Sequence, residues 1–163
     1  MMSKTIAAAL ILAGLSASPA LAQDAAAPAA DPPNSDYHFR YLNRLDPAEG
    51  WRRTVSGLRY RKVGGTADGP RPTVDDTVTI HYVGRFIDGT EFDSSVARGE
   101  PATFPLQNLI RGWQEGVPLM AVGDRYEFAI PYTLAYGPNG RGPIPGGATL
   151  IFTIDLIAID GQS

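Results

Sequence analysis

The chain has 163 residues with 17 acidic and 14 basic side chains, and it contains no cysteine. This slightly acidic balance, without any long cluster of lysine or arginine, argues against a nucleic-acid-binding surface. The absence of cysteine excludes disulfides and thiol chemistry, so stability must come from packing.

Residues 1–22 have the pattern of a secretory signal peptide. Lys4 supplies a positive charge, an apolar run extends from Ile6 to Leu15, and Ala20-Leu21-Ala22 is a small-residue cleavage site. The run is far shorter than the roughly 20 residues that cross a bilayer. We therefore expect cleavage after Ala22 and no stable membrane span, with an uncleaved anchor as the alternative.

Residues 23–50 are predicted to be a mostly disordered tether, because Ala, Pro, Asp and Asn dominate its first part. Aromatic residues appear after Tyr37, and the segment from Asp46 to Glu49 suits a short helix. His38 lies in this tether with no evident partner. Residues 51–163 are long enough for one domain with its own core.

Alternating patterns then predict β-strands at 58–63, 77–83 and 125–130. In the second of these, Val78, Ile80 and Tyr82 share one face, which leaves His81 on the other in a structural role. The Asp88-Gly89 pair predicts a hairpin turn. The almost wholly apolar run at 149–159 predicts a central strand that is covered on both faces.

One amphipathic helix is expected among these strands, from Ile110 to Met120. Apolar residues recur there at helical spacing, at Ile110, Trp113, Val117 and Met120, and Gly123 follows the end. The predicted fold class is therefore α+β, an antiparallel sheet with one short helix.

Short motifs in a fixed order give the chain a wider resemblance. They are Ile80-His81-Tyr82-Val83-Gly84, Asp88-Gly89-Thr90-Glu91-Phe92-Asp93, Ile110-Arg111-Gly112-Trp113, Val122-Gly123-Asp124, Leu134-Ala135-Tyr136-Gly137 and Ala148-Thr149-Leu150-Ile151-Phe152. From about Gly57 to Ala158 the chain resembles the FKBP-type peptidyl-prolyl cis-trans isomerases, and the segment from Arg98 to Ala102 is most similar to their secreted bacterial branch. The resemblance implies a curled antiparallel sheet wrapped around one short helix, and no cofactor or metal.

The resemblance also implies an aromatic pocket. Its floor is Trp113, and Asp93 is its acid. The walls are Tyr82, Phe92, Phe104 and Phe152, and the rim is formed by Leu109, Ile110, Tyr136 and Ile144. On spacing alone, most of these residues are more typical of a plain core than of a pocket, and Asp93 could cap the turn at Ser94 and Ser95.

Two departures from the family pattern bear on macrolide inhibitors. Ala102 stands where many members have a further aromatic wall, and the loop at 139–144 differs from that of the better-known single-domain members. Both changes open the pocket or alter its lid, which leaves macrolide binding open.

The implied activity is rotation of the bond before proline in exported polypeptides that are still unfolded or partly folded, in the periplasm. Because the sequence indicates no long amino-terminal helical region, we expect a monomer. Rotation breaks amide resonance, a barrier of roughly 18–20 kcal/mol, and a dry site favours the less polar twisted state without moving a proton. The alternative is a chaperone or peptide-binding module that uses the same cleft without catalysis. A carboxylate pair at Glu91 and Asp93 is a weaker, glycosidase-like alternative, and the glycines of 137–147 lack the GK[ST] of a phosphate loop.

Overall fold

The structure is a computed structural model that describes residues 36–66 and 68–160. The predicted signal peptide and the first part of the tether lie outside these residues. Two helical elements precede the sheet, the helix α1 (Asp36–Arg44) and the 3-10 turn η1 (Pro47–Glu49). Within the described ranges, no helix is long and apolar enough to cross a membrane.

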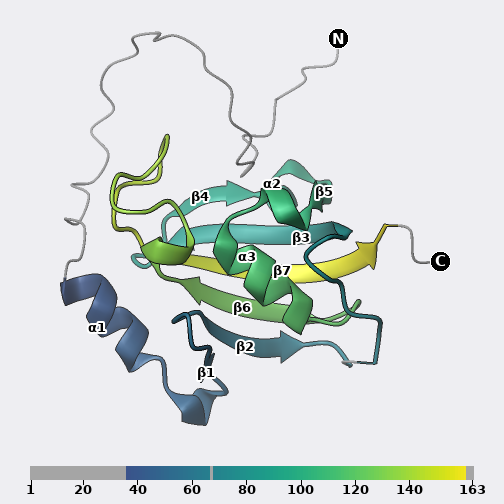
Figure 1. The fold of residues 1–163 in the computed structure, drawn as a ribbon, viewed down its shortest axis with the longest axis horizontal. Helices are drawn as coiled ribbons and strands as arrows, with labels where there is room; N and C mark the ends of the chain where they lie inside the picture. Colours follow the sequence, from purple (N-terminus) through teal and green to yellow (C-terminus); the bar gives the residue numbers. More distant parts are fainter. Residues whose placement is uncertain (1–35, 67, 161–163) are drawn as a thin grey trace, which may run out of the picture.

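One antiparallel sheet forms the body of the molecule, and a short helix lies across one of its faces (Figure 1). The order is β1-β2-β6-β7-β3-β4, with β5 also paired to β3, so β1 and β4 are the two ends of that path. The strands are β1 (Arg52–Arg53), β2 (Arg59–Gly64), β3 (Thr77–Phe86), β4 (Glu91–Ser94), β5 (Ala102–Pro105), β6 (Arg125–Ile130) and β7 (Leu150–Ile159). The remaining elements are α2 (Ser95–Arg98), η2 (Leu106–Asn108), α3 (Arg111–Gly116), η3 (Val117–Leu119) and η4 (Tyr132–Leu134). The predicted α+β class is confirmed.

The alternation expected in β3 is present and sets the face of the sheet that packs on the core. Val78, Ile80 and Tyr82 are at most 1% exposed, whereas the residues between them are half-buried. The predicted hairpin turn joins β3 to β4. The Phe86 N–H donates to the carbonyl of Thr90 at 2.8 Å, and Gly89 takes the left-handed conformation, φ 90°, that a side chain would resist.

The expected helix from Ile110 to Met120 is divided in two. The α-helix α3 ends at Gly116, and the 3-10 turn η3 continues the chain to Leu119. The cause is Pro118, which has no N–H to donate to the carbonyl four residues earlier. The predicted apolar face survives, because Ile110, Trp113, Val117 and Met120 are all buried.

Two glycines let α3 lie very close to the sheet. A Cβ at Gly112 would be 2.4 Å from Cγ2 of Ile130, and one at Gly116 would be 2.7 Å from Cε1 of Phe128. Both distances are shorter than any real carbon–carbon contact. The helix therefore sits against β6 with backbone, not side chains, at the points of closest approach.

The prediction for β7 was right about its place and wrong about its surroundings. β7 is the central strand, between β6 and β3. Its burial alternates, however: Leu150, Phe152, Ile154 and Leu156 are buried, whereas Ile157 on the other face is 42% exposed. An antiparallel sheet needs cover on only one face, and this strand follows that rule despite its apolar sequence.

The helix α1 was not expected from the sequence. Its His38, predicted to lack a partner, accepts a hydrogen bond on Nδ1 from the backbone N–H of Thr149 at 3.1 Å. Near the other end of the helix, Asn43 Oδ1 is 3.5 Å from a guanidinium nitrogen of Arg59 in β2. The helix expected at Asp46 is the 3-10 turn η1, which Asp46 caps by accepting from the Ala48 N–H at 2.8 Å.

Candidate active site

The predicted wall and floor residues meet in one cluster of aromatic rings at the centre of the molecule. Trp113 on α3 makes edge-on contacts with Tyr82 of β3 and Phe152 of β7, with ring centroids 5.3 Å and 5.1 Å apart. Phe104 of β5 lies 6.4 Å from the same indole, and Phe92 of β4 lies 5.6 Å from Phe152. Edge-on rings at such distances add roughly 0.5–1.5 kcal/mol per pair beyond burial.

A glycine in β3 makes this ring packing possible. A Cβ on Gly84 would lie 2.7 Å from Cζ of Phe92 and 2.8 Å from Cε1 of Phe152. Any side chain at this position would push the two rings apart. The glycine of the Tyr82-Val83-Gly84 motif is therefore needed for the shape of the cluster, not for a turn.

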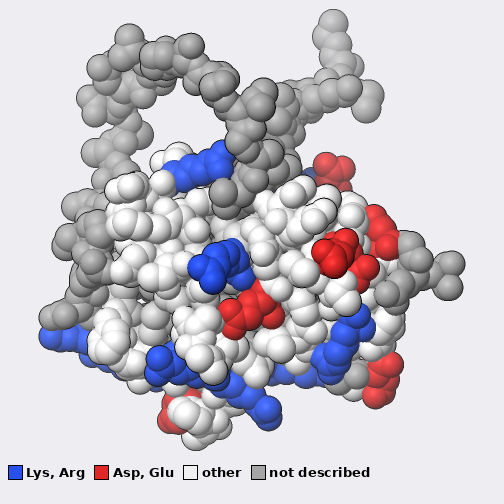
Figure 2. Space-filling model, viewed as in Figure 1, with Lys and Arg blue, Asp and Glu red and all other residues white. Residues whose placement is uncertain are grey.

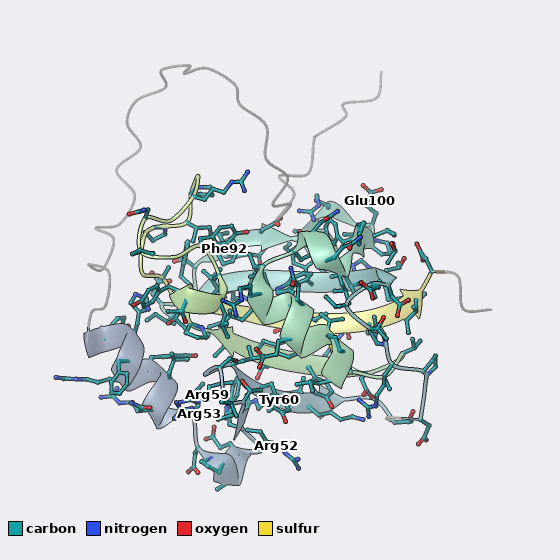
Figure 3. All side chains as sticks on the ribbon, viewed as in Figure 1. Arg52, Arg53, Arg59, Tyr60, Phe92 and Glu100 are labelled. Atoms are coloured by element: carbon teal, nitrogen blue, oxygen red, sulfur yellow. The ribbon has the colours of Figure 1, made fainter. Side chains whose placement is uncertain are left out.

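The predicted rim residues adjoin the same cluster. Leu109, Ile110 and Ile144 are 2%, 1% and 6% exposed, and Tyr136 is partly buried against the core. The cluster is most open at Phe92 and Tyr136, the two apolar site residues that keep partial exposure. Figure 3 shows Phe92 below the loop that follows η4. The structure thus brings all nine apolar site residues into one region.

Asp93 is held by two side chains rather than by the turn that follows it. It accepts a 2.5 Å hydrogen bond from the Tyr82 hydroxyl and pairs with a guanidinium nitrogen of Arg98, also at 2.5 Å. Ser94, not Asp93, caps α2 by accepting from the Ala97 N–H at 3.0 Å. The interpretation of Asp93 as a cap is therefore wrong.

Arg98 is the site residue that the sequence analysis missed. Its second guanidinium nitrogen donates to the Tyr82 hydroxyl at 2.9 Å, and the guanidinium lies 5.6 Å from the Tyr82 ring centroid. The pair of Asp93 and Arg98, five residues apart around a Ser94 cap, was the available signal. Together the three side chains form a closed, charge-balanced group at one edge of the cluster.

Burial controls the ionisation of both tyrosines. Removal from water raises the pKa of Tyr82 far above its ordinary value, and the hydrogen bond to Asp93 raises it further. Burial also raises the pKa of Tyr136 to about 12. The charge of Arg141 lowers this pKa, and the charge of Asp93 raises it by a smaller amount. A tyrosine hydroxyl is protonated at neutral pH even at its ordinary pKa of 10.0, and burial keeps these two protonated at higher pH as well, so both remain hydrogen-bond donors.

Two other polar features bear on what the site can do. The indole N–H of Trp113 is buried and has no acceptor among the described residues, a condition that is rare in folded proteins. The second carboxylate of the glycosidase-like alternative, Glu91, lies 3.7 Å from Arg85, whereas Asp93 pairs with Arg98. Neither acid is left as a free base for a hydrolytic step.

The remaining sequence predictions fall into place around the cluster. His81, on the outer face of β3, lies with Nδ1 3.0 Å from the Ser95 hydroxyl, a structural contact. Ala102 is half-buried in β5 beside the core. In the altered loop, Arg141 and Ile144 exchange two backbone hydrogen bonds, of 2.9 and 3.0 Å, which fix the segment before Ile144.

Comparison with known proteins agrees with this geometry. A sequence model of the FKBP-type peptidyl-prolyl cis-trans isomerases matches residues 69–157. The chain is 50% identical over 120 residues to the FKBP-type isomerase FkpA of Aeromonas hydrophila, covering 74% of this chain and 44% of that protein. It is 47% identical over 121 residues to the FKBP-type 22 kDa isomerase of Escherichia coli, covering 74% and 58%.

Solved structures show the same fold. The crystal structure of FkpA from Escherichia coli superposes with a TM-score of 0.72 at 36% identity, covering 76% of this chain and 57% of that one. An isomerase structure from Pseudomonas syringae gives a TM-score of 0.69 at 30% identity, covering 76% and 90%. The chain spans about half the length of the curated relatives it matches. All ten predicted site residues lie within the matched stretch, and the chain belongs to the FKBP-type peptidyl-prolyl cis-trans isomerase family.

Proposed function

We propose that this protein accelerates cis-trans rotation of the bond before proline, with the aromatic cluster as its active site. The observation that carries the proposal is the group of five packed rings closed on one side by the balanced Tyr82, Asp93 and Arg98 side chains. This arrangement is apolar, holds no free base, and keeps its hydroxyls protonated. Those properties suit a reaction in which a bond rotates and no proton moves.

The chemistry needs desolvation and a few aimed donors. Twisting the amide breaks its resonance and lowers the charge separation between oxygen and nitrogen, so a site without water favours the twisted state over the planar one. A thousandfold acceleration requires about 4 kcal/mol, at about 1.4 kcal/mol per factor of ten. One or two hydrogen bonds in a dry site supply energies of this size.

Each residue then has a specific role. The proline ring of the substrate packs on the Trp113 indole between Phe92, Phe104 and Phe152, while Leu109 and Ile144 contact the flanking chain. The Tyr136 hydroxyl and the Ile110 backbone N–H donate to substrate carbonyls. Asp93, fixed by Tyr82 and Arg98, contributes an oriented negative charge and not an acid or a base.

The test is cis-to-trans exchange of a short peptide with an X-Pro bond, measured for the wild type and for Tyr136→Phe. We expect strong acceleration by the wild type and a loss of roughly ten- to a hundredfold in the variant, the effect of one hydrogen bond to the reacting group. Tyr60→Phe, outside the cluster, is the matched control and should keep full activity. No acceleration by folded wild-type protein would instead leave a peptide-binding or chaperone module.

We also propose that the protein is exported to the periplasm as a monomer and acts there on proline-containing chains. The signal-peptide pattern of residues 1–22 and the bacterial relatives support this. Mass spectrometry of the exported protein should give a chain that begins at Gln23, and light scattering should give the mass of one copy. Macrolide binding is a separate question, which calorimetry with such a compound on wild type and Ala102→Phe addresses.

A further inference from the structure

Charge is distributed very unevenly along this chain. Residues 36–64 hold seven arginines and lysines against three acids, whereas residues 65–160 hold six against twelve. The first segment folds into α1, β1 and β2, at one end of the sheet. Figure 2 shows lysine and arginine side chains gathered along the lower edge of the molecule, where Figure 1 places these elements.

The centre of this region is a pair of arginines that face each other. Arg53 of β1 and Arg59 of β2 are directly opposite in the strand register, a position where like charges destabilise a sheet. Arg59 is only 9% exposed, and its hydrogen-bond acceptors are the Gly57 carbonyl at 3.0 Å and the Asn43 side chain at 3.5 Å. Burial, and then the charge of Arg53, lower the pKa of Arg59.

Buried arginine is rare in proteins unless a carboxylate pairs with it. Within residues 36–66 and 68–160, no carboxylate forms an ion pair with Arg44, Arg52, Arg53 or Arg59. The nearby acids are already engaged: Glu49 and Glu127 with Arg61, and Glu115 with the Ser56 hydroxyl at 2.6 Å. We call Arg44, Arg52, Arg53 and Arg59 the arginine edge, and Figure 3 labels the last three close together on β1 and β2.

A hollow opens beside the arginine edge on the other side of β1. Its volume is about 470 Å³, and Arg52, Lys62 and the stacked rings of Tyr60 and Tyr126 contribute to its lining. A hollow of this size can take a small polar group. Positive side chains therefore flank both sides of this short edge strand.

Exposed apolar side chains accompany these charges. Val55, in the turn between β1 and β2, is fully exposed, and Phe39 on α1 is 68% exposed. Phe39 lies one helical turn before Asn43, the residue that reaches Arg59, so it is on the same stripe of α1. Tyr37 on the same helix is 51% exposed.

We propose that the arginine edge, with Phe39 and Val55, docks this protein on an anionic phospholipid surface. Arginine beside exposed aromatic and apolar side chains is the chemistry of a protein that lies at the headgroup level of a membrane. A small soluble anion would use the arginines and leave the exposed Phe39 and Val55 without a function. An extended flat surface uses both.

Docking at this edge would leave the aromatic cluster accessible. The arginine edge is at the β1 end of the sheet, whereas Phe92 and Asp93 are on β4 at the other end. A protein held by β1 therefore keeps its aromatic cluster turned toward the solvent. Polypeptides near the membrane could reach the cluster without displacing the contact.

The experiment is co-sedimentation of the full chain with vesicles of equal parts phosphatidylglycerol and phosphatidylcholine, at about 0.15 M salt, where charges act over about 8 Å. We expect more binding to these vesicles than to pure phosphatidylcholine. All variants carry the same amino-terminal segment, so a difference between variants does not come from that segment. Arg52→Gln with Arg53→Gln should weaken it about thirtyfold, at about 1 kcal/mol per arginine near the surface. Both side chains are exposed, so the folded protein tolerates the change.

The matched control is Arg85→Gln with Arg125→Gln, which removes the same charge elsewhere and should leave binding within twofold. Polyglutamate serves as a soluble polyanion that offers negative charge without an apolar surface. Phe39→Ser should weaken vesicle binding severalfold and leave binding to polyglutamate unchanged. Equal loss in the control, no preference for the anionic vesicles, no effect of Phe39→Ser, or equally tight binding of polyglutamate would each overturn the proposal. Isomerisation of a soluble peptide should stay the same in every variant.

Discussion

The aromatic cluster and the arginine edge lie at different places on one sheet and treat charge in opposite ways. At the cluster, the single acid, Asp93, pairs with Arg98 and accepts a hydrogen bond from Tyr82, and the aromatic rings pack edge-on around Trp113. At the edge, Arg53 faces Arg59, and no carboxylate of residues 36–66 and 68–160 forms an ion pair with either. The charge of Asp93 is balanced inside the cluster, whereas the positive charges of the arginine edge would be balanced by a partner of opposite charge.

The two regions also differ in their relation to the family model. The cluster lies inside residues 69–157, which the family model covers, and the arginine edge precedes them. The relatives and solved structures match a longer stretch, about three quarters of the chain. The chemistry of the aromatic cluster is therefore the part that the family model describes, and the arginine edge needs an explanation from its own contacts.

The largest expected effect is the difference in stability lost when a residue of each region is replaced by alanine. Trp113→Ala removes a ring that is 1% exposed, and should lower the free energy of unfolding by about 3–5 kcal/mol. Arg52→Ala, at an exposed edge position, should change it by less than about 0.5 kcal/mol. Urea denaturation measures both. A cost below about 1 kcal/mol for Trp113→Ala would show that the rings are not closely packed.

A double-mutant cycle compares a sheltered ion pair with an exposed one. The side chains of Asp93 and Arg98 are 14% and 24% exposed, so the cycle of Asp93→Asn and Arg98→Gln should give a coupling energy of about 1.5–3 kcal/mol, as expected for a hydrogen bond between charged groups. The pair of Arg125 and Asp155, which is 56% and 30% exposed, should show a coupling below about 1 kcal/mol. Equal coupling energies in the two cycles would contradict the difference in environment.

The protonation of Tyr136 offers a test at high pH. Because burial raises its pKa from 10.0 to about 12, the folded state binds this proton more tightly than the unfolded state does. The resulting stabilisation is complete below pH 10 and disappears as the pH rises through about 12. The phenolate absorbance of wild type minus Tyr136→Phe should show one group titrating near 12. Titration of that group near 10 would mean that water reaches the hydroxyl freely.

The smallest expected effect is a change in stability caused by the repulsion between Arg53 and Arg59. Arg53→Gln removes the charge opposite Arg59, so it should raise the free energy of unfolding by about 0.2–1 kcal/mol. The gain should vanish at about 1 M salt, where charges are screened within about 3 Å. Arg111→Gln is the control and should show no such gain. A loss of stability in Arg53→Gln would mean that this arginine has a favourable partner.

The sequence predicted the sheet and the site well where local patterns carry the information. Alternation in β3 places Tyr82 on the core face, and the ordered motifs place Trp113, Phe152 and Tyr136 in one cluster. Spacing alone would have assigned the same residues to an ordinary core. The motif order, not the hydrophobic pattern, distinguished a site from a core.

The failures have a different cause, because they depend on contacts between distant residues. The helix α1 is short and is held in part by the bond from Thr149 to His38, 111 residues away, and short helices depend on such packing. Arg98 joins the site only because α2, four residues long, turns its guanidinium back toward Tyr82. The error in β7 is of another kind, because Thr153 and Asp155 lie on the outer face with Ile157 and alternate with the buried Phe152, Ile154 and Leu156; the local pattern was available, and the apolar composition of the run concealed it.

The central position of β7 has a consequence for how this protein itself comes into being. β7 pairs with β3 along nine residues and with β6 along six, yet it is the last strand in chain order. The sheet therefore cannot close until residues 150–159 have arrived, and pairings between distant segments fold slowly. A chain that emerges from one end stays open until its final strand is delivered. Until then β3 and β6 each present one unpaired edge.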